Sequence, residues 1–226
     1  MEVAEIFCSI QGEGSLAGAP SVFVRLAGCP LRCRWCDTKY ARSPLAGEKL
    51  SPDKILETVR QYNCPRLVVT GGEPFAQPQL AELLSALAPH FDHITIETAG
   101  IAFLPNLPVQ LMSISPKLSN SAPADPAFKD LHEKGRLNFR ALNALLTHYN
   151  CQLKFVVEAA DDLDEILELL KSLPPVPKEK IFLMPQAVTP EEYVEKSRLA
   201  AGLCLRTGFC FSPRLQVLLW PGQRGK

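Results

Sequence analysis

The chain has 226 residues, of which 46% are hydrophobic, and its 24 lysines and arginines balance 24 aspartates and glutamates. We expect residues 1–226 to form a single domain, because this length supports one substantial core. The charge balance excludes a net basic field for nucleic acid and favours a small-molecule substrate. No apolar run approaches the roughly 20 residues that cross a bilayer and no signal peptide is evident, so we expect a soluble, cytoplasmic protein with reduced cysteines and no membrane contact.

A short strand and a glycine-rich loop open the chain. Residues 5–10, EIFCSI, predict a strand with Cys8 in the core, and the loop spans about residues 8–18. Gly12, Gly14 and Gly18 permit positive φ angles and close backbone approach. From the residues alone, an ordinary hairpin turn explains this loop equally well.

The next strand leads into three closely spaced cysteines. Residues 22–27, VFVRLA, predict a buried strand, after which Cys29, Cys33 and Cys36 form a C-x3-C-x2-C array on a loop. A structural zinc site needs four ligands, and no histidine or further cysteine lies nearby in the sequence with metal-ligand spacing. An iron–sulfur cluster held by three thiolates leaves one iron open for a ligand that is not protein.

Three side chains around the cysteines each allow two interpretations. Arg25 interrupts an apolar strand, so it either clamps a carboxylate or faces solvent at a sheet edge. Thr38 offers a hard oxygen to a Mg²⁺ shell, although a threonine here is more commonly a cap or turn residue. Trp35 either covers a cluster or serves packing.

The middle of the chain predicts alternating helices and strands. Ser51 caps a helix that begins at Pro52. The strand 66–70 ends in the sequence TGGEP, whose two glycines expose backbone amides and carbonyls that can hold an ammonium group. The strand 93–97 ends at Glu97, which either faces a substrate or belongs to a structural ion pair.

The second half continues this alternation with one exception. Residues 118–134 have low hydrophobicity and predict a disordered excursion or a lid. The tail, about residues 203–226, predicts short strands. The other expected elements are strands 110–114, 151–157 and 180–184, and helices 77–89, 140–148, 162–173 with Asp161 as cap, and 189 to about 202.

Six strands separated mostly by helices indicate a parallel sheet. They are too few to close a standard eight-fold barrel. We therefore expect an α/β fold, an open, trimmed (β/α) partial TIM barrel of about six parallel strands, with the functional residues at the carboxyl ends of the strands.

The cysteine array, with Trp35 before its last cysteine, resembles the radical S-adenosylmethionine superfamily. Together with SIQGEG, CDTKY, TGGEP and SPK, it resembles the 7-carboxy-7-deazaguanine synthase family within that superfamily. The resemblance implies a [4Fe–4S] cluster on Cys29, Cys33 and Cys36 and Mg²⁺ at Thr38. It implies S-adenosylmethionine contacts from Trp35, Cys36, Asp37, Gly72, Glu73, Ser115, Pro116, Lys117, Met184, Pro185, Gln186 and Ala187. It implies substrate contacts from Ile10, Gln11, Gly12, Arg25, Thr70 and Glu97.

The resemblance also implies a reaction and partners. The family is a carbon–nitrogen lyase that abstracts hydrogen from 6-carboxy-5,6,7,8-tetrahydropterin through a 5′-deoxyadenosyl radical and contracts the ring to 7-carboxy-7-deazaguanine, releasing ammonia. A flavodoxin- or ferredoxin-like electron donor and a homodimer are expected with it. Two alternatives stay open. An activase that places a glycyl radical on a partner protein shares the cysteine loop and TGGEP but lacks SIQGEG and CDTKY, and a non-catalytic module would hold zinc.

Overall fold

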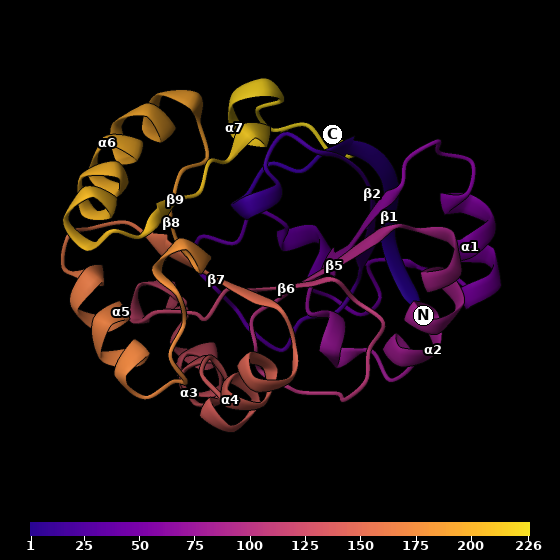
Figure 1. Cartoon of the computed structure of the whole chain (residues 1–226), viewed down its shortest axis with the longest axis horizontal. Helices are drawn as coiled ribbons and strands as arrows, with labels where there is room; N and C mark the ends of the chain where they lie inside the picture. The colour runs from indigo at the N-terminus through magenta and orange to yellow at the C-terminus, as the bar shows by residue number, and fades with distance from the viewer.

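The computed structural model describes residues 1–226 and contains one nine-stranded sheet, in the order β3-β1-β2-β4-β5-β6-β7-β8-β9 (Figure 1). β1 (Glu2–Ile10) pairs antiparallel with both β2 and β3 (Glu48–Lys49). From β2 onward all neighbours pair in parallel: β2 (Pro20–Leu26), β4 (Arg66–Gly71), β5 (His93–Thr98), β6 (Leu111–Ile114), β7 (Cys151–Val157), β8 (Ile181–Pro185) and β9 (Cys210–Phe211). The predicted open parallel sheet is confirmed.

Seven α-helices connect the strands: α1 (Pro52–Val59), α2 (Leu80–Leu87), α3 (Pro126–Gly135), α4 (Phe139–His148), α5 (Asp162–Lys171), α6 (Pro190–Thr207) and α7 (Leu215–Leu219). Single 3₁₀ turns lie at Gly14–Leu16, Lys39–Ala41, Pro74–Ala76, Ala88–His90, Ser119–Ser121 and Lys178–Lys180. The predicted start of α1 is confirmed, because the Ser51 side chain accepts a hydrogen bond from the Lys54 amide at 3.2 Å.

The two faces of the sheet differ in chemistry. Alternate residues of the strands face a core of 35 buried residues shared with α1, α2, α4, α5 and α6. In β7, for example, Cys151, Leu153 and Phe155 belong to this core. The intervening positions face the opposite side, and there Gln152 and Lys154 are buried as well. One face of the sheet is thus an apolar core under helices, and the other carries buried polar groups.

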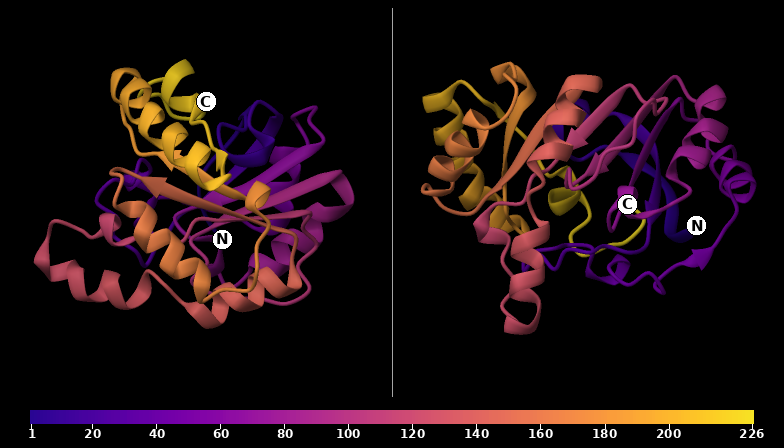
Figure 2. Two further views of the ribbon diagram at one scale, coloured as in Figure 1. Left: turned by 60° about the vertical axis from the view of Figure 1, so that its left-hand side comes forward. Right: turned by 90° about the horizontal axis from the view of Figure 1, so that it is seen from below.

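Three predicted elements differ from the structure in the second half of the chain. The segment 118–134, predicted as a disordered excursion or a lid, holds most of α3, which begins after Asp125 because that side chain caps the helix at the Ala127 amide (2.9 Å). The helix projects from the body (Figure 2). The apolar run in the tail forms the short helix α7 in place of a strand, and α6 continues to Thr207, where Gly208 ends it in the left-handed conformation.

Two smaller expectations were also wrong. Asp161 makes no capping bond to α5. The Asp162 carboxylate instead accepts bonds from two amides that precede the helix, those of Glu158 (2.7 Å) and Ala159 (3.0 Å). Cys8 is exposed and lies outside the core.

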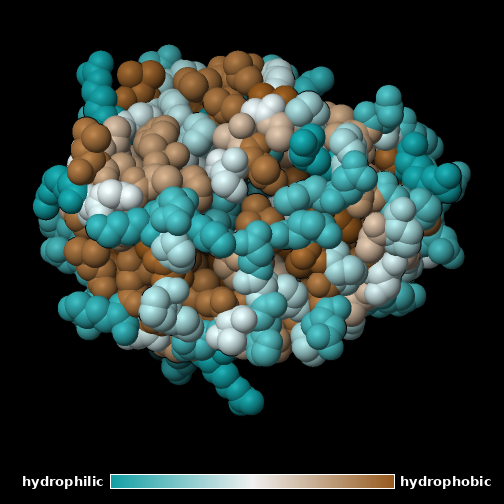
Figure 3. Space-filling view, viewed as in Figure 1, coloured by the Kyte–Doolittle hydropathy of each residue, from teal (hydrophilic) through white to brown (hydrophobic).

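The surface combines hydrophilic areas with apolar ones. In Figure 3 the apolar areas lie mainly at the top and on the left, over the region of α5, α6 and α7. The most exposed large apolar side chains there are Leu205 (88%), Val194 (49%) and Leu219 (53%). None of the helices has both the length and the apolar composition needed to span a membrane.

Candidate active site

The predicted cluster ligands lie on one loop at the carboxyl end of β2. The amide of Cys29 donates to the carbonyl of Arg42 at 3.0 Å, which closes the base of the loop. Cys29, Cys33 and Cys36 pack in one small apolar cluster with Leu31, Trp35, Ala99 and Ile101. No other cysteine belongs to this cluster, so the structure places the three predicted thiols in one apolar environment without a fourth thiol.

The surroundings of these thiols fit a metal-bound thiolate better than a free one. Burial raises the pKa of Cys29 to about 11 and also raises the pKa of Cys33, while the nearby Lys117 ammonium acts in the opposite direction. A thiolate here needs a positive partner, which an iron ion supplies. No group of three or more His, Cys, Asp and Glu side chains, the three cysteines included, converges closely enough to hold a metal ion in this structure. The thiols fit an iron–sulfur cluster by donor type and by their position on one loop.

The TGGEP turn packs directly against the cysteine loop. The amide of Gly72 donates to the Leu26 carbonyl (2.8 Å), and the amide of Glu73 donates to the Gly28 carbonyl (2.9 Å). A Cβ atom on Gly72 would lie 2.2 Å from that Gly28 oxygen, so only glycine fits. Both amides are consumed within the protein, which corrects the expectation that they face a ligand. The side chain of Glu73 is 1% exposed and points to the end of β5.

The predicted SPK segment lies beside Trp35. Ser115 follows β6, and Pro116 after it is buried. The Lys117 ammonium donates to the Ser115 carbonyl (2.8 Å) and hydroxyl (2.9 Å) and lies 5.7 Å from the centroid of the Trp35 ring. Two segments that are about 80 residues apart in the sequence and are both predicted to contact the cofactor are thus side by side, because both leave carboxyl ends of parallel strands.

A cavity of about 380 Å³ lies next to this pair. Its lining joins Trp35 and Cys36 of the cysteine loop to Gln186 after β8, with Arg34, Lys39, Ala124, Glu158 and Val188 around them. The other predicted residues of this segment do not line the cavity: Met184 and Pro185 are buried in β8, and Ala187 is fully buried after it. The structure therefore brings Gln186 alone, of these four, to the cavity.

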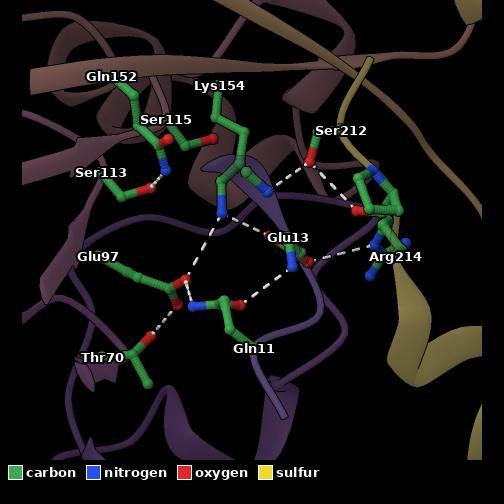
Figure 4. A network of polar contacts seen from close by, with 12 residues as sticks. Gln11, Glu13, Thr70, Glu97, Ser113, Ser115, Gln152, Lys154, Ser212 and Arg214 are labelled. Carbon is green, nitrogen blue, oxygen red and sulfur yellow. Dashed lines mark hydrogen bonds and ion pairs between the residues drawn. The ribbon is translucent and has the colours of Figure 1, made fainter. Parts of the chain in front are cut away.

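A polar network joins three of the predicted substrate residues (Figure 4). It lies on the face of the sheet opposite the apolar core, which we call the inner face. Glu97 accepts hydrogen bonds from the Thr70 hydroxyl (2.9 Å) and the Gln11 side-chain amide (3.1 Å). Gln11 also accepts a bond from the Glu13 amide (3.0 Å), which folds the glycine-rich loop over the sheet. Glu97 lies 3.6 Å from the Lys154 ammonium, so the structure shows the ion pair that was one of its two alternatives, and its contact with a substrate stays a prediction.

Four residues of this network were missed by the sequence analysis: Glu13, Lys154, Arg214 and Gln216. Lys154 lies 2.5 Å from Glu13, and Gln216 donates to Glu13 at 2.7 Å. Burial disfavours both charges, yet the pKa of Glu13 is lowered by Lys154 and Arg214 and that of Lys154 is raised by Glu13 and Glu97. The sequence CQLKFVV carries polar residues at two alternate positions, Gln152 and Lys154, within an otherwise apolar strand. Alternate residues of a strand share one face, so this pattern could have indicated that Lys154 lies on a polar face of the sheet. No local pattern singled out Arg214 or Gln216.

The remaining predicted substrate and metal residues make other contacts. Arg25 is neither unpaired nor at a solvent-facing edge: its Nε donates to Glu5 at 2.6 Å, and its side chain is 17% exposed. Ile10 ends β1, and Gly12 packs against Gln216, whose amide oxygen would lie 1.9 Å from a Cβ atom there. The Thr38 hydroxyl lies 3.7 Å from the Cys36 sulfur and contacts no carboxylate.

Comparisons with known proteins show the family of this chain. Residues 24–117 match the model of the radical SAM superfamily. The chain is 36% identical to a 7-carboxy-7-deazaguanine synthase of Halobacterium salinarum over 97% of this chain and 90% of the relative. It is also 36% identical to the synthase of Pyrobaculum aerophilum, over 100% of this chain and 97% of the relative. A third synthase, from Rhodopirellula baltica, is 34% identical over 99% and 88% of the two chains.

Solved structures give the same result at the level of the fold. The crystal structure of QueE from Escherichia coli matches with a TM-score of 0.72 at 25% identity, over 93% of this chain and 92% of that one. SuiB of Streptococcus suis, in a structure bound to S-adenosylmethionine, shares the fold at a TM-score of 0.54 and 10% identity, over 84% of this chain and 51% of that one. The cysteine loop, the network on the inner face and these full-length relatives together show that the chain belongs to the 7-carboxy-7-deazaguanine synthase family of radical SAM enzymes.

Proposed function

We propose that this chain converts 6-carboxy-5,6,7,8-tetrahydropterin to 7-carboxy-7-deazaguanine and ammonia, as a carbon–nitrogen lyase. One observation carries the proposal: Gln11, Thr70 and Glu97 form one hydrogen-bonded patch on the inner face of the sheet, at the same edge as the three-cysteine loop. A substrate bound there lies between the glycine-rich loop and the strand ends, where a reactive group is held close and water is excluded.

The patch has the donors and acceptors that a pterin requires. A pterin ring presents N–H donors and a carbonyl acceptor along its edge, and the Glu97 carboxylate can accept from such N–H groups while Gln11 offers a donor and an acceptor. The Nε of Arg25 is bonded to Glu5. The two terminal nitrogens of its guanidinium would therefore bind the substrate carboxylate. Ile10 and Gly12 would contribute loop contacts beside them.

The cofactor side uses the loops described above. When bound, the [4Fe–4S] cluster and S-adenosylmethionine supply the one-electron chemistry that removes a hydrogen from the substrate. Cys29, Cys33 and Cys36 would hold the cluster. An ammonium needs acceptors, and because the amides of Gly72 and Glu73 are already bonded, carbonyls of the TGGEP turn would hold the methionine amino group.

The adenosine portion would lie along the cavity beside Trp35. The lining by Trp35, Cys36 and Gln186 supports this assignment, since an aromatic ring and an amide suit a purine. Lys117, which lies 5.7 Å from the centroid of the Trp35 ring, and its partner Ser115 would contact the ribose and carboxylate. Asp37, Met184, Pro185 and Ala187 would act through their backbone.

Mg²⁺ is a separate part of the proposal. The Thr38 hydroxyl would be one ligand, with the substrate carboxylate and waters filling the rest of the octahedral shell that magnesium prefers. The ion would neutralise the carboxylate during the rearrangement.

The partners and location complete the proposal. The one-electron chemistry needs an external donor, for which we propose a flavodoxin- or ferredoxin-like protein. The exposed apolar side chains of α6 and α7, among them Val194 and Leu219, support a homodimer. All eight cysteines are free thiols, which fits a reducing compartment such as the cytoplasm.

The decisive experiment is an anaerobic reaction with reductant, S-adenosylmethionine and the carboxytetrahydropterin, followed by chromatography for the deazaguanine. We expect about four irons with matching sulfide and little zinc in anaerobically purified protein. Cys33→Ala should lose both the cluster and 5′-deoxyadenosine release, while Cys64→Ala, a cysteine before β4 and remote from the loop, should keep both. Thr38→Ala should weaken the magnesium response and leave the cluster intact.

Two results would contradict the proposal. Stoichiometric zinc without iron would identify a zinc-binding module. A cluster that cleaves S-adenosylmethionine but leaves the pterin unchanged would remove the substrate assignment. If Thr38→Ala leaves the magnesium response unchanged, the role assigned to that hydroxyl is wrong.

A further inference from the structure

Arg214, in the segment between β9 and α7, contacts three separate loops. Its Nη2 lies 2.6 Å from an oxygen of Asp37, its Nη1 donates to the Ala187 carbonyl at 2.5 Å, and its Nε lies 3.4 Å from Glu13. The side chain is 8% exposed. Its backbone amide donates to the Tyr193 hydroxyl at 3.3 Å, so the whole residue is fixed from α6.

These three partners belong to the three loops that surround the candidate site. Glu13 lies in the glycine-rich loop over the proposed substrate patch, and Figure 4 shows Arg214 reaching it from the C-terminal segment. Asp37 directly follows the last cysteine of the cysteine loop. Ala187 directly follows Gln186, which lines the cavity beside Trp35. One guanidinium thus bridges the substrate side and both cofactor loops.

The chemistry of the guanidinium makes this bridge specific. Its planar fork fixes the directions of its donors, so partners held on different N–H groups keep a fixed spacing. Arg214 is the only protein group that bonds the Asp37 side chain, and that carboxylate is 51% exposed. Glu13 is held independently by Lys154 and Gln216. The glycine-rich loop is therefore anchored without Arg214, whereas the cysteine loop depends on Arg214 for its connection to that anchor.

We propose that Arg214 is a positioning residue that couples the substrate loop to the two cofactor loops, so that ligand binding on one side strengthens binding on the other. This inference rests on the proposed function for the identity of the ligands. The bridge itself is made entirely of the protein's own residues.

The first test uses ligand-free protein and hydrogen–deuterium exchange. Arg214→Ala should speed exchange in residues 36–40 and 186–188 by about tenfold or more, which corresponds to ~1.4 kcal/mol of lost local stability. Exchange in β4 and β5 should not change. Arg214→Lys keeps the positive charge but loses the planar guanidinium with its several donors. It should therefore also speed exchange in residues 36–40, in residues 186–188, or in both. Arg206→Ala, an exposed arginine at the end of α6, is the matched control and should behave as wild type.

The second test measures coupling by calorimetry. In wild-type protein carrying its cluster, the carboxytetrahydropterin should tighten S-adenosylmethionine binding by about fivefold or more, which is the usual lower range of coupling between sites. In Arg214→Ala this tightening should vanish, and 5′-deoxyadenosine released per deazaguanine formed should rise. Asp37→Asn removes only the ion pair between Asp37 and Arg214, at a half-exposed position. It should reduce the effect of the pterin on S-adenosylmethionine affinity without altering hydrogen exchange near Ala187.

The outcomes separate the inference from the function. Unchanged exchange in both loops of Arg214→Ala, or undiminished tightening, would overturn the coupling role. A variant with a lower melting temperature but the wild-type ratio of 5′-deoxyadenosine to product would show a merely structural residue and also overturn it. If wild type fails to bind the pterin, the proposed substrate is wrong, and the exchange experiment alone then decides whether Arg214 connects the loops.

Discussion

At the scale of single residues, Glu73 shows how a residue in a functional motif can have a structural task. Its carboxylate accepts hydrogen bonds from the Thr98 hydroxyl (2.7 Å) and from the amides of Ala99 (2.8 Å) and Phe75 (3.2 Å). Burial raises its pKa, and these donors act in the opposite direction. The side chain ties the end of β4 to the end of β5, two strands that carry proposed substrate and cofactor residues.

We predict that Glu73→Gln destabilises the ligand-free protein by ~1–3 kcal/mol, because an NH₂ group then faces donors that need an acceptor. Urea unfolding should show a lower midpoint with an unchanged slope. Glu82→Gln on the exposed surface of α2 is the control and should change stability by less than ~0.5 kcal/mol. A Glu73→Gln protein with wild-type stability that loses only S-adenosylmethionine binding would show that the residue serves the cofactor alone.

At the scale of elements, α3 is anchored to the site by one buried residue on an otherwise exposed helix. His132 accepts the amide hydrogen of Arg32, in the cysteine loop, on Nδ1 at 3.1 Å. Its Nε2 lies 2.9 Å from the Ser121 hydroxyl, which itself donates to the Leu118 carbonyl. The ring is therefore neutral, with its proton on Nε2. At the end of the helix, Arg136 pairs with Glu165 at 3.0 Å.

This anchor predicts a pH dependence. Burial, and then the charge of Arg136, lower the pKa of His132. As the pH decreases, the unfolded chain therefore binds a proton at this histidine before the folded protein does. The stability from this group is complete above the ordinary histidine pKa of about 6.5 and falls as the pH decreases below it. Thermal unfolding of ligand-free protein from pH 7.5 to 5.5 should show this loss.

The matched variants make the test specific. His132→Asn should lower stability at pH 7.5, since it loses the Ser121 contact. Between pH 7.5 and pH 5.5, however, its stability should decrease less than that of the wild-type protein. His90→Asn, at an exposed position after α2, should keep the wild-type slope. Equal slopes in wild type and His132→Asn would exclude His132 as the source of the pH dependence.

At the scale of the whole molecule, a single sheet connects every part of the site. The core of 35 residues runs from Met1 to Phe209 without interruption, so the first and last strands share one apolar layer. The sheet does not close into a barrel, because its two edges are the two-residue strands β3 and β9. On the face opposite the core, segments from both halves of the chain meet, as the contacts of Glu13 with Lys154 and Arg214 show.

A continuous core predicts cooperative unfolding, which tests the proposal of a single domain. Phe155→Ala, at a fully buried position on β7, should destabilise the protein by ~3–5 kcal/mol. Tryptophan fluorescence and far-ultraviolet circular dichroism should report one coincident transition, shifted equally for both probes. Phe128→Ala on the exposed surface of α3 should have little effect. Two separated transitions would show that the halves of the chain fold as separate domains.

The sequence by itself determined the alternation of strands and helices, the open parallel sheet and the three-cysteine loop. These depend on local signals: apolar runs such as VFVRLA, the cap at Ser51, and a ligand spacing within eight residues. The same signals were too weak for α3 and α7, because a short helix with few buried residues leaves little apolar periodicity to detect.

Only the tertiary structure decided which side chains share the inner face. Glu13, Lys154 and Arg214 lie about 60 to 200 residues apart in the sequence, and their contacts depend on strand order and on the fold of the C-terminal segment. A buried charge is tolerable only with a partner, and the partner's identity is a property of three-dimensional proximity that no local pattern encodes.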